Sequence, residues 1–163
     1  MKLHDKYVLR LANTSIGNEA PVLNTTRDTA TIRLPNWLRN LGKCNVRVTD
    51  MLISSKNGSG ASVFAASTRI GALVCRDIPI LGWSNEVNGA PIVLGSGIHN
   101  EAEDCVKLDS ASALEFTCIE LPSQVTLERM AYDPANGTLV AAKAQTAAVC
   151  PFQITMELTF EGC

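Results

Sequence analysis

Histidines are the side chains that proteins use most often for acid–base catalysis and for metal binding. This chain of 163 residues has only two of them, His4 and His99, and they lie far apart in the sequence. A metal site in a small β-protein takes several of its ligands from histidines, which this chain cannot supply in number. We therefore predict no metal and no cofactor.

Residues 99–105 form the one segment in which a histidine, several carboxylates and a thiol, Cys105, occur together. Such side chains are able to ligate a metal ion, and a thiol beside an imidazole is a recognised nucleophile arrangement. The spacing matches no metal motif, and nothing identifies one of the six cysteines as activated. A solvated acidic loop between two strands explains the segment more simply, so we predict no catalytic residue and no metal dependence, and that the protein is not an enzyme.

The glycine-rich stretches at residues 57–60 and 95–97 lack the Lys-Ser/Thr pair that follows a phosphate-binding loop, and we interpret them as loops or bulges. Trp37 and Trp83 are candidates for sugar-stacking platforms or for anchors of a protein interface. Aromatic residues make up only 5% of the chain, which disfavours a carbohydrate platform. We predict that Trp37, Leu38 and Trp83 contribute to an interface, in segments 35–41 and 81–88. The competing interpretation is that the two indole rings close the ends of the fold.

The six cysteines show no C-x-x-C spacing, which argues against a zinc ribbon or finger. Residues 1–10 contain several charged side chains and no apolar stretch typical of an export signal. We therefore expect a cytosolic chain whose cysteines are reduced, buried thiols. The cysteines are Cys44, Cys75, Cys105, Cys118, Cys150 and Cys163.

The length is that of one domain, and we expect residues 1–163 to form it. A net charge of −2 offers no basic surface for a nucleic acid, so we predict no direct nucleic-acid partner. No run approaches the roughly 18 apolar residues of a membrane helix, so we predict no membrane span. Charged residues make up 18%, below the roughly 25% typical of soluble domains, which suggests that other subunits cover part of the surface.

The elements that must carry these residues are strands. Residues 152–160 alternate between apolar and polar side chains without a fault, which predicts a strand with one buried face. Residues 7–11 and 30–34 show the same period. The predicted core-facing side chains of the last strand are Phe152, Ile154, Met156, Leu158 and Phe160.

Residues 46–53 change apolar phase near Asp50, as a β-bulge would cause. Asn-Gly pairs at 57–58, 88–89 and 136–137 favour tight reversals between strands, and 35–41 and 101–106 each allow one short helical turn. About eight strands result, and they predict an all-β fold: an antiparallel eight-stranded jelly-roll sandwich. The further β-rich runs are 63–75, 91–98, 114–121 and 125–132.

The pattern of these strands resembles the single jelly-roll minor capsid and penton proteins of large icosahedral double-stranded DNA viruses. The resemblance is carried by strand order and pattern rather than by a catalytic or binding motif. It implies eight strands in two four-stranded sheets, and a role in the virion at the fivefold vertices or between capsomers. The residues that carry it are 7–11, 29–35 leading into 44–55, 125–132, the turn at 136–137 and 152–160.

The function we expect is therefore a structural component of a viral capsid. We expect a homopentameric penton, or another minor capsid protein, whose partners are the major capsid protein and other minor capsid proteins. The length leaves no room for an added receptor-binding domain. One alternative is a ligand-binding jelly-roll module, lectin-like or cytokine-like and trimeric. Another is a small β-fold hydrolase or isomerase, although no carboxylate pair or histidine cluster points to it.

Overall fold

The computed structural model describes residues 4–14, 21–24, 29–56, 70–75, 77–78, 92–133, 138–141 and 151–161. This part of the chain contains eleven strands, one four-residue helix, α1 (Asn36–Arg39), and one 3-10 turn, η2 (Ser110–Ser112). The strands are β1 (His4–Ala12), β2 (Val22–Asn24), β3 (Thr29–Arg33), β4 (Cys44–Ser54), β5 (Ile70–Cys75), β6 (Ile92–Asn100), β7 (Cys105–Lys107), β8 (Glu115–Cys118), β9 (Gln124–Asp133), β10 (Thr138–Ala141) and β11 (Phe152–Glu161).

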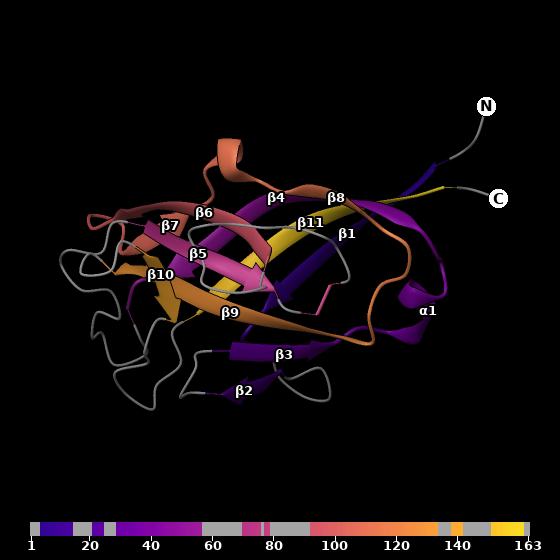
Figure 1. The fold of residues 1–163 in the computed structure, drawn as a ribbon, viewed down its shortest axis with the longest axis horizontal. Helices are drawn as coiled ribbons and strands as arrows, with labels where there is room; N and C mark the ends of the chain where they lie inside the picture. Colours follow the sequence, from indigo (N-terminus) through magenta and orange to yellow (C-terminus); the bar gives the residue numbers. More distant parts are fainter. Residues whose placement is uncertain are drawn as a thin grey trace.

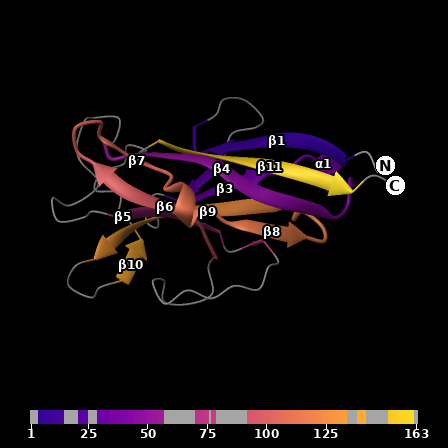
Figure 2. The same ribbon diagram turned by 90° about the horizontal axis from the view of Figure 1, so that it is seen from above.

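Every strand pair among these residues is antiparallel. The strands follow the order β1-β11-β4-β7-β6-β5-β9-β3-β2, with β8 also paired to β4 and β10 to β9 (Figure 1). The sheet curls on itself, so that β1, β11 and β4 lie on one side of the molecule and β5, β6 and β9 on the other (Figure 2). The prediction of an all-β antiparallel fold is confirmed.

The core lies inside this curl and contains side chains from both halves of the sheet. All five predicted core residues of β11 belong to it, and none of them is more than 4% exposed. The intervening side chains, such as Gln153 and Thr155, are only partly buried. The inward face predicted for the last strand is therefore confirmed.

The bulge predicted near Asp50 is also present. Thr155 of β11 pairs with Asp50 and Met156 pairs with Val48, so Thr49 is the extra residue on β4. Val46 and Val48 are buried before the bulge, and Met51 and Ile53 after it. The bulge corrects the phase of the strand and keeps one apolar face directed at the core.

The number of strands differs from the prediction because three of them are too short to show a period. β2 and β7 have three residues each and β10 has four, and a strand of this length reveals no alternation in the sequence. The helical turn expected at 35–41 is present as α1. Residues 101–104 form a turn and not a helix, and the Asn-Gly pairs at 57–58, 88–89 and 136–137 lie outside the described residues.

Strand β6 connects the two halves of the curled sheet. It pairs with β5 from Ile92 to Ile98 and with β7 through His99 and Asn100. A register shift opposite Leu73 and Val74 places a bulge in β6 beside the glycine-rich stretch 95–97, as the sequence suggested. The glycines allow close approach of other backbone at this crossing, since a side chain on Gly97 would meet the Lys107 carbonyl.

Candidate functional site

An open cavity of about 500 Å³ lies where β4 ends and where β7 and β11 begin. Its lining is mixed, with charged, hydroxyl, amide and apolar side chains. It includes three residues of the acidic segment 99–105 that was considered as a metal site, Glu103, Asp104 and Cys105. The lining residues are Thr14, Leu52, Ser54, Glu103, Asp104, Cys105, Lys107, Pro151, Phe152 and Gln153.

The charged groups at this cavity are joined in pairs of opposite sign. The Lys107 ammonium contacts the Glu103 carboxylate, and Lys56 Nζ lies 3.2 Å from Asp104 Oδ2. The hydrogen bond from Lys107, together with its charge, lowers the pKa of Glu103, and the same contact raises the pKa of Lys107. The two carboxylates are thus already matched by two lysines, which leaves little net charge to attract an ion.

Cys105 is the nucleophile candidate at the cavity, and its surroundings keep it protonated. Its thiol lies 3.7 Å from Glu103 Oε2, to which it donates. Burial is the main cause that raises the pKa of Cys105 above its usual value. Because the thiolate and not the thiol attacks, this cysteine is a poor nucleophile at neutral pH.

His99 does not assist Cys105. In the β6–β7 pairing, His99 lies opposite Val106, whereas Cys105 lies opposite Asn100. Directly paired residues share a face of the sheet and neighbours along a strand alternate, so His99 and Cys105 point to opposite faces. The structure therefore does not bring together the imidazole and the thiol that occur in the same segment of the sequence.

The acidic segment between them is a hairpin loop, as predicted. The Asn100 side-chain oxygen accepts hydrogen bonds from the backbone N–H groups of Ala102 and Glu103, at 3.0 and 3.3 Å. Asp104 then takes a positive φ of 53°, a conformation that Asp tolerates better than most residues. Within the described ranges, no group of three or more His, Cys, Asp or Glu side chains is placed to hold a metal ion.

The three predicted interface residues lie in different environments. Trp37, on α1, is 59% exposed, and its ring centroid lies 6.1 Å from that of Tyr7 on β1. Leu38 is only 3% exposed and belongs to the core, because consecutive residues of a helical turn point in different directions. Leu38 therefore packs within the fold and is not available to an interface as predicted. Trp83 and segment 81–88 lie outside the described residues.

Cys44 on β4 and Cys118 on β8 form a pair of cysteines that no sequence pattern predicted. These two cysteines are direct partners in the register of the two strands, and both are buried. The Cys118 thiol donates to the backbone oxygen of Glu120 at 3.0 Å. Burial, and then the proximity of Cys118, raises the pKa of Cys44 to about 11, and burial raises that of Cys118. Their separation in the sequence offers no signal that they would meet.

This raised pKa predicts an alkaline loss of stability. Cys44 titrates near 9.0 without perturbation and near 11 in the fold, so the folded state retains the proton more tightly. Its contribution is complete below pH 9 and is lost as the pH rises toward 11, by about 2 kcal/mol. Urea unfolding at a series of pH values measures this loss. Between pH 9 and 11, the free energy of unfolding should fall less for Cys44→Ala than for the unmodified chain. If the free energy of unfolding of the variant falls with pH as steeply as that of the unmodified chain, the burial of the Cys44 thiol is contradicted.

No protein-family model matches this chain, and no curated protein matches it either. Among the described residues, no helix has the length and apolar character needed to cross a membrane. The structure itself defines an all-β protein with one curled antiparallel sheet and an open cavity of mixed polar and apolar lining at one end of it.

Proposed function

We propose that this chain is a structural component of an icosahedral viral capsid. In this role it is the homopentameric penton at the vertices, or another minor capsid protein that holds capsomers together in the virion. Its partners are the major capsid protein and other minor capsid proteins. The observation that carries the proposal is the order of the strands in the curled sheet, which we interpret as that of a jelly roll.

The strand order supports this interpretation when the short strands are treated as additions. β7 and β8 pair with different parts of β4, at residues 52–54 and 44–47, and so count as one interrupted strand. We also set aside the short strands β2 and β10. The eight strands that remain, with β7 and β8 counted as one and numbered along the chain, follow the order 1-8-3-6-5-4-7-2 around the curled sheet. This is the order of two interlocked Greek keys, the jelly roll that many capsid subunits use.

Exposed apolar side chains on the surface of the molecule support an assembled protein. Val8, Ile98 and Ile119 are 74%, 73% and 79% exposed. Ile98 lies directly opposite Ile70, which is also exposed, so the two form an apolar pair on the β5–β6 surface. Covering such side chains with a neighbouring subunit removes apolar surface from water and so stabilises the assembly.

The oligomeric state of the purified full-length chain tests the proposal directly. Native mass spectrometry is expected to show a closed ring of five subunits for a penton. Co-expression with a major capsid protein is expected to place the chain at particle vertices or between capsomers. A monomer that never enters particles would contradict the proposal.

Trp37 tests the interface more locally. We expect Trp37→Ser to leave a folded, soluble subunit that assembles poorly, because this ring is largely exposed in the isolated chain and buried aromatic anchors dominate protein contacts. Thermal unfolding and native mass spectrometry measure the two effects separately. Lys43→Ser is the matched control, an exposed polar residue shortly after α1. Unfolding of the Trp37 variant, or normal assembly, would refute the assignment.

The open cavity favours a second candidate, a ligand-binding module of the lectin-like or cytokine-like kind, usually trimeric. Hydroxyl and amide groups from Thr14, Ser54 and Gln153 line the cavity beside the two ion pairs. Such groups are able to orient a small polar ligand. A trimer in native mass spectrometry, together with a saccharide bound in a glycan screen and lost in Gln153→Ala, would favour this candidate over the capsid protein.

A further inference from the structure

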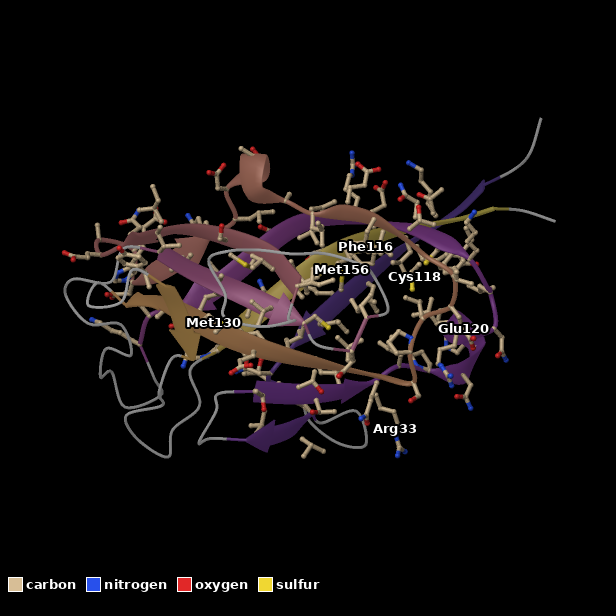
Figure 3. All side chains as sticks on the ribbon, in the orientation of Figure 1. Arg33, Phe116, Cys118, Glu120, Met130 and Met156 are labelled. Carbon is tan, nitrogen blue, oxygen red and sulfur yellow. The ribbon has the colours of Figure 1, made fainter. Side chains whose placement is uncertain are left out.

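The pairing of β4 with β8 brings two thiols together on the inner face of the sheet. Cys44 lies directly opposite Cys118, and the same register continues through Asn45 and Thr117. Paired residues of antiparallel strands have Cα atoms about 4.5 or 5.5 Å apart, and both values lie within the range of about 4.4–6.8 Å found in disulfides. Cys118 lies in the same region as Phe116 and Met156 (Figure 3), and both cysteines belong to the core.

We propose that Cys44 and Cys118 form a modification site, an intramolecular cross-strand disulfide that closes when the protein meets a disulfide oxidant such as oxidised glutathione. In the structure both residues are thiols. The bond would join the short strand β8 to the centre of the sheet, because β4 is paired with β11 along its other edge.

The position of Cys118 makes it the first thiol to react. It is the last residue of the four-residue strand β8, whose only strand partner in the described part of the chain is β4. Short strands that are paired along one edge open locally far more often than a central strand such as β4. Local opening exposes Cys118 to the oxidant while Cys44 stays close to it.

The reaction is a thiol–disulfide exchange in two steps. The Cys118 sulfur attacks one sulfur of oxidised glutathione, which breaks the glutathione S–S bond and releases one glutathione. The Cys44 sulfur then attacks the Cys118 sulfur of this mixed disulfide and releases the second glutathione. One protein S–S bond has formed, one glutathione S–S bond is lost, and the protons of the two protein thiols end on the two glutathiones.

The register also predicts selectivity among the described cysteines. Cys75 lies opposite Ile92 and Leu127, and Cys105 lies opposite Asn100 and Ser54, so neither faces another described cysteine across a strand pair. In reducing conditions an excess of reduced glutathione drives the exchange back to the two thiols. The bond is thus expected outside a reducing compartment and not within one.

The test uses the reduced full-length chain, incubated with mixtures of oxidised and reduced glutathione, blocked with N-ethylmaleimide and digested for mass spectrometry. We expect the loss of two of the six thiols and a linked peptide pair containing Cys44 and Cys118. The oxidised chain should unfold about 5–15 °C higher than the reduced chain. Cys44→Ser and Cys118→Ser should abolish the linked pair and the rise in Tm, whereas the matched control Cys105→Ser should retain both.

Peptide mapping of the unmodified chain tests the Cys44–Cys118 disulfide without any variant. If Cys44 and Cys118 both remain alkylated by N-ethylmaleimide while other cysteines become linked, the proposal is wrong. It is equally wrong if they link only after the chain has been unfolded in denaturant, because the folded register would then not have brought them together.

Discussion

Replacing Leu158 with Ala is expected to lower the free energy of unfolding by about 2–5 kcal/mol, the range found for large-to-small changes in cores. Leu158 is completely buried on β11, where it pairs with Val46 on one side and Tyr7 on the other. β11 is paired on both sides, with β1 and with β4, so the backbone cannot easily collapse into the space that the side chain leaves. Urea unfolding, with the midpoint and slope both measured, determines the loss.

Thr159→Ala is the matched control for this change. Thr159 is the next residue of the same strand, is only partly buried, and points to the opposite face. We expect it to change stability by less than about 1 kcal/mol. Equal losses for the two variants would show that β11 does not present one face to the core, and the strand register would have to be revised.

Gly97→Ala is expected to destabilise the fold as strongly as many core truncations, by about 1–3 kcal/mol or more. A Cβ atom at this position would overlap the backbone carbonyl of Lys107 and contact the Val106 side chain. Relief requires β6 to move away from the end of β7. Because β6 carries the connection between the two halves of the curled sheet, such a shift disturbs both.

Gly42→Asn provides the control for the glycine prediction. Gly42 has a φ of 84°, and a Cβ atom there would meet nothing within 4 Å. Asn tolerates this left-handed conformation, so we expect a change of less than about 1 kcal/mol. Thermal unfolding of both variants makes the comparison. A Gly97→Ala protein as stable as the unmodified chain would mean that β6 does not approach Lys107 closely.

Much of the β-structure was predictable because it depends on local alternation. The faultless period of residues 152–160 identified both the strand and its buried face. The change of phase near Asp50 located a bulge to within one residue, since only an inserted residue keeps both halves of β4 facing inward. Leu38, which was predicted to lie at an interface, is buried in the core, because a four-residue helix has no period from which to tell its inner side.

The candidate site was predictable only in its parts. The acidic loop was recognised from its composition, but the cavity beside it also needs Ser54 and Gln153, which come from distant segments. The ion pair of Lys56 with Asp104 likewise joins residues that no short-range motif connects. These groups meet because β4, β7 and β11 end or begin at the same edge of the fold.

The sequence by itself determined the strand character of the chain, the inward face of β11 and the bulge in β4. The tertiary structure alone decided that Cys44 faces Cys118, that His99 and Cys105 point to opposite faces, and that Gly97 lies against Lys107. The physical reason is the range of the interactions. Alternation of side chains is a property of a single strand, whereas the register between distant strands depends on how the whole sheet closes around one shared core.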